Sequence, residues 1–225
     1  MDRLLASAEQ EAYDYVLQRI RNGAFRAGDR LIAEDIAVAI SASRMPVRVA
    51  FRRLATEGLL LIRPNRGATV RGITVAEMRE VFEMRAVLEA QAVRVALPHL
   101  GAQELRDVEN LLERMDRHGA DVQQWVTHHR NLHEYLCGLS QRPRLIAQIA
   151  ALHSFVEPHM RLWMEHTAKP NSTEHDHHAL LHALRRGDPD EVEEAMREHI
   201  VSTIPPLEKL MADGVPLPAA VSRQA

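Results

Sequence analysis

The stretch Ile36–Gly72, IAVAISASRMPVRVAFRRLATEGLLLIRPNRGATVRG, decides the fold of this chain. It begins with apolar residues at helical spacing, and the small-residue turn at 41–43 interrupts that spacing. Ser43 is a residue type that caps helices, and Pro46 is tolerated in a first helical turn, so a second helix is predicted to begin at about Arg44. The pattern predicts two helices joined by a tight turn.

A basic hairpin follows the second helix. Gly58 is predicted to end the helix, and residues 59–62 and 68–71 are predicted strands joined by a tight turn at Pro64-Asn65-Arg66-Gly67. Helix, turn, helix and basic hairpin in this order predict a winged helix-turn-helix domain. The amphipathic segment Leu4–Asn22 predicts a further helix that packs under this domain.

The second helix separates its arginines from its apolar stripe. Between residues 44 and 53 there are four arginines and no acidic residue. A solvated helix face usually mixes charges, whereas phosphates and guanine edges both attract guanidinium groups. We expect Arg44 and Arg48 to read bases or the phosphates beside them, Arg52 and Arg53 to favour phosphates, and the wing to enter the minor groove or its edge. The predicted DNA-binding residues are Ser43, Arg44, Met45, Arg48, Arg52, Arg53, Asn65, Arg66 and Gly67.

The charge distribution supports this assignment. Residues 1–72 hold 12 arginines and 8 acidic residues, although the whole chain has a net charge of −3. The basic end is therefore the expected nucleic-acid end. No apolar run approaches the ~18 residues that span a bilayer, and the N-terminal pattern is not that of a signal peptide. We expect a cytoplasmic protein with no membrane partner. The single Cys137 excludes an internal disulfide framework and a multi-cysteine metal site.

The rest of the chain predicts an all-α second domain over residues 73–213. Gly and Pro punctuation separates six predicted helices, at 74–97, 101–118, 121–139, 142–166, 172–186 and 188–212. Helical bundles of this kind build ligand sites in their interiors from facing side chains. The tail 214–225 is rich in Pro and Ala and is expected to be loose. The predicted fold class is mainly α, with the winged domain over 1–72 and the bundle after it.

Four histidines are predicted to face the interior of this bundle. His129 and His133 are four residues apart on one helical stripe, and His177 and His199 lie on the apolar stripes of the last two helices. A single core histidine is usually an ordinary hydrogen-bonded residue. Four inward imidazoles on three helices instead favour a divalent metal, because a metal offsets the cost of burying unpaired polar groups.

The first domain resembles the GntR family of bacterial transcription regulators. Residues 23–31, GAFRAGDRL, resemble the family's G-x-F-x-P-G-x-R-L entry, and residues 43–48, SRMPVR, resemble its S-R-T-P-V-R core. This chain has Ala27 for Pro, Ser41 for Gly, Met45 for Thr and Val49 for Glu, and the turn and fold are expected to survive these changes. Met45 alters the expected base preference, because a thioether can press on a thymine methyl group but cannot make a hydroxyl's hydrogen bond.

The second domain resembles the FCD effector-binding domain of the FadR-type branch, in its six-helix form. Metal-bearing members of that family show D-x-x-x-H on one helix and two further histidines on the last two helices. His133, His177 and His199 match this pattern, and His129 occupies the aspartate position. Nitrogen in place of oxygen favours zinc or nickel over manganese or magnesium. We therefore expect a homodimeric repressor of a palindromic operator in double-stranded DNA, controlled by a small carboxylate effector bound near the metal.

Two arginines of the bundle are candidates to anchor the effector's carboxylate. Arg85 shares a helix face with Met78 and Phe82 and is therefore expected to point inward. The alternative for Arg85 is a structural ion pair with Glu89, four residues later. Arg161, in the predicted helix 142–166, is a second and weaker candidate.

A metal-dependent hydrolase built on the four histidines is the alternative function. It needs a general base near the metal, and the sequence contains no H-E-x-x-H pairing, while Glu134 falls off the histidine stripe. We therefore expect no enzymatic activity. A histidine-rich bundle that only dimerises would leave the arginine-bearing helix and the wing unexplained.

Overall fold

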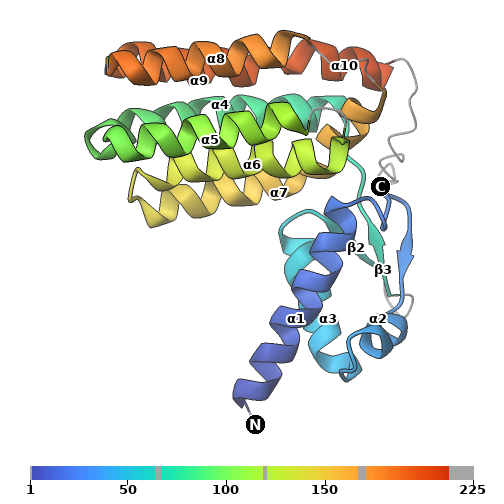
Figure 1. Ribbon diagram of the computed structural model, residues 1–225. Helices are drawn as coiled ribbons and strands as arrows, with labels where there is room; N and C mark the ends of the chain where they lie inside the picture. The colour runs from blue at the N-terminus through green and yellow to red at the C-terminus, as the bar shows by residue number, and fades with distance from the viewer. Residues whose placement is uncertain (1, 64–66, 119–120, 167–170, 213–225) are drawn as a thin grey trace. The chain divides into compact units, whose positions relative to one another are not determined.

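The computed structural model describes residues 2–63, 67–118, 121–166 and 171–212, and the chain divides into two compact units between Thr74 and Val75 (Figure 1). The first unit contains α1 (Asp2–Arg21), β1 (Arg30–Leu31), α2 (Ala33–Ala39), α3 (Arg44–Thr56), β2 (Leu60–Arg63) and β3 (Gly67–Val70). The second contains α4 (Val75–Ala96), the short 3-10 helix η1 (Leu97–His99), α5 (Ala102–Arg117), α6 (Val122–Gly138), α7 (Pro143–His166), α8 (Asn171–Arg186), α9 (Pro189–Val201) and α10 (Ile204–Ala212). The predicted fold class is confirmed. Across the described ranges, no helix has the length and apolar character needed to cross a membrane.

The α3 helix is held in place by its apolar stripe. Its buried residues Val47, Ala50, Phe51 and Leu54 face inward, and the helix packs against α1 and α2. Ser43 is the N-cap residue, but its side chain makes no capping hydrogen bond, so the expected side-chain cap is wrong. The extended backbone of Ser43 (φ −84°, ψ 165°) begins the helix without it.

The turn between α2 and α3 forms although Ser41 replaces the glycine expected from the resemblance to the GntR family. Ser41 adopts a φ of 53°, in the left-handed region that glycine occupies most readily. The turn is closed by backbone hydrogen bonds from the Ser41 N–H to the Val38 carbonyl at 3.2 Å and from the Ala42 N–H to the Ala37 carbonyl at 2.9 Å. These bonds hold Ser41 in a conformation that costs an L-residue roughly 1–2 kcal/mol.

The wing belongs to a three-stranded antiparallel sheet in the order β1-β3-β2, whereas the sequence predicted two strands. Leu31 of β1 pairs with Ala68 of β3, and Arg63 of β2 pairs with Gly67. A two-residue strand is too short for period-two alternation to reveal. Gly67 has a φ of 81°, and a Cβ atom there would lie 2.2 Å from the Leu31 carbonyl oxygen, so the junction of β1 and β3 requires glycine.

The second unit is built around α4. This helix packs against α6, α7 and α9, and it is buried around much of its circumference, in part by small residues such as Ala90 and Ala92. Figure 1 shows the long helices of this unit running side by side. Arg79 of α4 also holds α10, because its guanidinium donates to both Glu208 carboxylate oxygens, at 2.8 and 2.7 Å.

The single helix predicted at 188–212 is wrong, because the chain turns at Ser202 and Thr203 and divides there into α9 and α10. Pro205 and Pro206 explain the break. Neither has a backbone N–H with which to continue the hydrogen bonds of α9, although both are tolerated in the first turn of a new helix.

The Cys137 thiol lies in a small apolar cluster of the bundle with Ala92 and Ile149. It is 1% exposed. Burial, with a smaller contribution from the Glu89 carboxylate, raises the pKa of the thiol well above its usual value. Cys137 is therefore an inert packing residue in the folded protein.

Candidate nucleic-acid interface and metal centre

The exposed face of α3 presents the residues predicted to bind DNA. Arg44, Arg48 and Arg52 are exposed, and Met45 is 62% exposed although it is apolar. Asn65 and Arg66 lie outside the described residues. Gly67 has the structural role given above, and a DNA contact from its backbone stays a prediction.

A groove of about 520 Å³ adjoins this face of α3. Four arginines line it: Arg48 and Arg52 from α3, Arg30 from β1, and Arg63 from the end of β2. Sequence reasoning missed Arg30 because the pairing of β1 with β3 was not predicted, and it missed Arg63 because this residue follows the predicted strand 59–62. The arginines of β1 and β2 extend the cationic surface beyond the recognition helix.

Two of the predicted DNA-binding arginines have partners within the protein. Arg44 donates to Glu34 of α2 at 2.8 Å, and this hydrogen bond lowers the pKa of the Glu34 carboxyl. Arg53 donates to Glu57 at 3.3 Å and to Gln10 of α1 at 3.0 Å, and its guanidinium lies 3.8 Å from the centre of the Tyr13 ring. A phosphate contact from Arg53 would compete with this link between α1 and α3.

The structure brings the four predicted metal-ligating histidines together inside the bundle. His129 and His133 come from α6, His177 from α8 and His199 from α9, and each is buried, with at most 9% exposure. Each offers one ring nitrogen, and these four atoms lie within 4.8 Å of one another. The His133 and His199 Nε2 atoms are only 3.1 Å apart. Nitrogen ligands of one tetrahedral zinc ion, at Zn–N distances of ~2.0–2.1 Å, have comparable separations.

Glu89 of α4 was missed as a member of this site, and it orients His133. Its Oε2 atom lies 2.6 Å from His133 Nδ1, and the carboxylate is fully buried. Burial alone would raise the pKa of Glu89, but Arg85, helped by His153 and His133, holds that pKa well below its usual value. Because the carboxylate is ionised, His133 donates from Nδ1, which leaves the Nε2 lone pair directed toward His199. A carboxylate–histidine pair of this kind typically supports a metal ligand.

Arg85 points inward, as predicted, and it forms the ion pair that the sequence left as the alternative. Its Nε donates to Glu89 Oε1 at 2.8 Å, and the two side chains are 2% and 0% exposed. His153 of α7, also missed, lies 3.0 Å from Glu89 Oε1 and 3.3 Å from an Arg85 terminal nitrogen. The predicted anion anchor therefore already has a buried anion as its partner. Arg161 is half-buried on α7.

The buried histidines are suited to be neutral ligands. Burial, followed by the neighbouring histidines, lowers the pKa of His129 and of His199 well below the usual value. His199 Nδ1 is also a buried atom without a hydrogen-bond partner among the described residues. Cations compete with protons for imidazole nitrogens, so depressed pKa values keep these nitrogens available at neutral pH.

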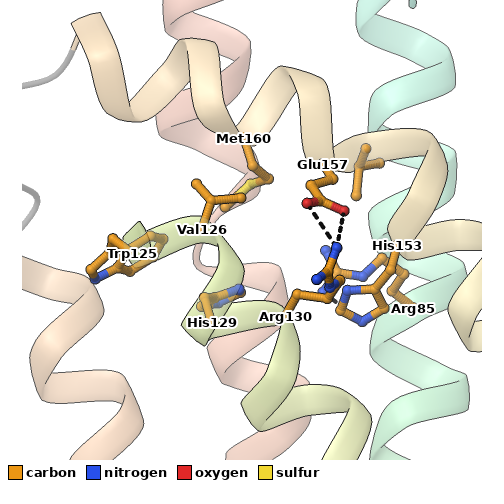
Figure 2. Close-up of a pocket in the computed structure, with 9 residues that line it drawn as sticks. Arg85, Trp125, Val126, His129, Arg130, His153, Glu157 and Met160 are labelled. Atoms are coloured by element: carbon orange, nitrogen blue, oxygen red, sulfur yellow. Dashed lines mark hydrogen bonds and ion pairs between the residues drawn. The ribbon is translucent and has the colours of Figure 1, made fainter. Parts of the chain in front are cut away.

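A small cavity adjoins the histidine cluster between α6 and α7 (Figure 2). Its volume is about 10 Å³, which is room for roughly one water molecule. Polar wall residues include Arg85, His129, Arg130, His153 and Glu157. Trp125 also lines the cavity, and its ring stacks on His129 with a centroid distance of 4.9 Å and an interplanar angle of 20°.

His153 predicts a pH dependence of the metal-free bundle. Burial and the positive charge of Arg85 lower its pKa from 6.5 to about 4, so between these values the unfolded chain binds a proton that the folded protein does not. The free energy of unfolding should therefore fall as pH decreases through this window. Denaturant unfolding of chelator-treated protein at several pH values measures the slope. In His153→Gln the proton uptake on unfolding near pH 5 should be smaller by about one proton, and an unchanged slope would contradict the assignment.

The fold defines a DNA-binding regulator of the winged-helix class. It combines the arginine-bearing α3 and the basic winged sheet with a separate bundle that holds the buried histidine cluster. The family model "Bacterial regulatory proteins, gntR family" matches residues 8–70, and the FCD domain model matches residues 80–202. The chain belongs to the GntR family of bacterial transcription regulators, and its second domain is an FCD domain.

Similar proteins agree with this assignment. The chain is 30% identical to the Nta operon transcriptional regulator of Aminobacter aminovorans over 73% of its own length and 78% of that protein. It is 26% identical to the transcriptional repressor RspR of Escherichia coli over 85% of each chain. Among solved structures, E. coli McbR/YncC matches with a TM-score of 0.81 at 24% identity, over 91% of this chain and 98% of that one. This last likeness shows the shared fold.

Proposed function

We propose that this regulator is a homodimeric repressor of the FadR-type branch that binds a palindromic operator. We further propose that its FCD domain binds one divalent metal, zinc or nickel, and a small carboxylate effector. The convergence of four buried histidine nitrogens within 4.8 Å of one another is the observation that carries the metal and effector parts. Relatives named as repressors, such as RspR, support the direction of regulation.

The metal would be held by His129, His133, His177 and His199. Each would bind as a neutral imidazole, and Glu89 would fix the orientation of His133 from behind. A divalent cation held by four neutral ligands keeps its full +2 charge and supplies an attraction for an anionic oxygen. A carboxylate is therefore the effector chemistry that this donor set favours. An effector that changes DNA affinity must itself bind with an affinity that DNA changes equally.

The hydrolase alternative gains no support from Glu89 or Glu134. A general base works best with a pKa near the operating pH, whereas Arg85 holds the pKa of Glu89 well below its usual value. Glu134 is 45% exposed, and it lies beside Arg130 at 3.6 Å. Neither carboxylate is placed as the base of a hydrolytic site.

Gel-shift titration against the DNA upstream of the protein's own gene tests the regulatory function. The metal-loaded protein should bind one operator with dyad symmetry, since the symmetry of a dimer is mirrored in its site. Adding the effector should change that affinity. Binding with no sequence preference, or binding as a monomer, would contradict the proposal.

Substitutions on α3 should separate base reading from phosphate contact. Arg48→Ala should weaken operator binding by about 1–3 kcal/mol and relax base preference, whereas Arg52→Ala should chiefly reduce the salt slope by about one unit. Arg44→Ala should resemble Arg48→Ala, after allowance for the Glu34 bond that it also removes. Fluorescence anisotropy on operator and scrambled duplexes at several salt concentrations measures both effects.

Glu34→Gln provides the matched test of Arg44. It should tighten operator binding, because it weakens the 2.8 Å bond that DNA must replace. Asp35→Asn removes the same charge from the next position of α2 and serves as the control. Equal effects of Glu34→Gln and Asp35→Asn would reduce the Glu34 result to a general charge effect. Wild-type operator binding by both Arg44→Ala and Arg48→Ala would contradict the placement of α3 against DNA.

A further inference from the structure

The cavity beside the histidines is too small for any carboxylate effector as it stands. Its volume of about 10 Å³ holds roughly one water molecule, whereas acetate alone has four heavy atoms. Binding of an effector therefore requires that a side chain leave the cavity wall. The wall residue that is least buried should move at the lowest cost in free energy.

Arg130 and Glu157 form the polar part of the wall that is least committed to the core. Arg130 of α6 donates from one terminal nitrogen to both Glu157 oxygens of α7, each at 3.1 Å, as the dashed lines in Figure 2 show. Their side chains are 17% and 8% exposed, whereas Arg85 and Glu89 are 2% and 0% exposed. The Arg130–Glu157 pair is therefore closer to solvent than the Arg85–Glu89 pair, and its separation should disturb the core less.

Arg130 has donor capacity beyond its bond to Glu157. Within the part of the chain that the structure describes, its buried Nε atom has no hydrogen-bond partner, and the Glu134 carboxylate lies 3.6 Å from it as an ion pair. A guanidinium can bind a carboxylate through two parallel N–H groups, but Glu157 engages only one terminal nitrogen in this arrangement. The Arg130 guanidinium can therefore bind a carboxylate, and Glu157 leaves part of its donor capacity unused.

The geometry points to Arg130 as the residue that pairs with the effector's carboxylate, and to Glu157 as the internal carboxylate that occupies its place until the effector displaces it. This inference rests on the proposed carboxylate effector and specifies its binding residue. It assigns that role to Arg130 rather than to Arg85, which Glu89 already neutralises. Val126, Val156 and Met160 complete the wall and suit a short aliphatic segment on the ligand.

The test uses full-length protein loaded with nickel, with acetate, succinate and citrate as probes. Isothermal titration calorimetry is the readout, and thermal melting is the second readout. Glu157→Gln should tighten binding of at least one probe about tenfold, because it weakens the charged hydrogen bonds that the probe must replace. Arg130→Met should weaken binding at least tenfold, because it removes the guanidinium that pairs with the probe.

Two further variants keep the result interpretable. Glu134→Gln removes the same charge beside Arg130, but Glu134 is 45% exposed and does not line the cavity, so probe affinity should stay near wild type. The double variant Arg130→Met/Glu157→Gln removes both charges of the pair together, so it should be less destabilised than Arg130→Met alone. It should also fail to bind the probe.

Equal tightening by Glu157→Gln and Glu134→Gln would reduce the effect to general electrostatics and overturn the displacement. Wild-type affinity in the double variant would overturn the role of Arg130, while the carboxylate effector itself would stand. If the nickel-loaded wild type binds none of the three probes, the carboxylate effector of the proposed function fails, and the assignment of Arg130 fails with it.

Discussion

Protein purified without a histidine tag and supplied with zinc or nickel should bind about one metal equivalent through its four buried histidines. His133→Ala and His177→Ala should each bind less than about a tenth of an equivalent, because each removes one of the four nitrogen ligands. These two residues come from α6 and α8, so their substitution tests convergence between helices and not one local motif. Plasma emission spectrometry of the dialysed proteins measures the occupancy.

Trp125 gives the same experiment a second readout. Its ring lies 4.9 Å from the His129 ring, so nickel at the histidine cluster should quench its fluorescence. His182→Ala, in α8 but outside the cluster of four, serves as the control and should retain both metal and quenching. Manganese as the preferred ion would contradict the argument that His129, in place of an aspartate, selects for nitrogen-preferring metals.

Competition between protons and the metal for the imidazole nitrogens sets the pH below which the metal leaves. The pKa values of His129 and His199 are lowered by burial, so protons should displace the metal only below the usual histidine range near pH 6.5. Metal-dependent stabilisation should accordingly be retained at neutral pH and lost on acidification. Loss of the metal already at pH 7 would mean that the imidazoles are not held neutral.

Breaking the buried pair of Arg85 and Glu89 should have the largest effect on stability of any substitution considered for this domain. Arg85→Met and Glu89→Gln should each lower the free energy of unfolding by about 3–5 kcal/mol, because each leaves a buried charge without its partner. The double variant should lose less than the sum of the two, since it leaves neither charge behind. Denaturant unfolding of the metal-free proteins measures this cycle.

The two single variants should differ in metal affinity. Glu89→Gln removes the carboxylate that accepts from His133 Nδ1 at 2.6 Å, and loss of such a partner typically weakens metal binding about 10–100-fold. Arg85→Met leaves that carboxylate in place. Arg185→Met, which breaks the exposed pair with Glu109, is the control and should cost about 0–1 kcal/mol. Additive losses in the cycle would contradict the coupling of Arg85 to Glu89.

Sequence patterns predicted the helices well because amphipathic periodicity is a local property. They failed where structure depends on distant partners. The Arg30–Leu31 strand exists only because β3 pairs with it, and the strand is too short to show alternation. The break before Ile204 was visible in Pro205 and Pro206, but it was passed over because apolar spacing continues through it.

The histidine cluster was predictable because each of its four members lies on an apolar stripe. His153 lies on such a stripe too, with Ile149 and Val156, and that signal could have found it. Glu89 was recognised only as a helical neighbour of Arg85, because its contact with His133 joins residues 44 positions apart. Arg130 gave no signal in the sequence, since its role depends on how α6 and α7 pack.

The buried thiol of Cys137 can report how often the bundle opens locally. A thiol reagent can reach this cysteine only when the apolar cluster with Ala92 and Ile149 opens, because the side chain is 1% exposed. Since the chain has one cysteine, every modification event counts one opening of α6 from its neighbours. At a reagent concentration where the reaction outpaces reclosing, the rate of labelling equals the frequency of that opening, and a ligand that ties α6 to other helices should slow it.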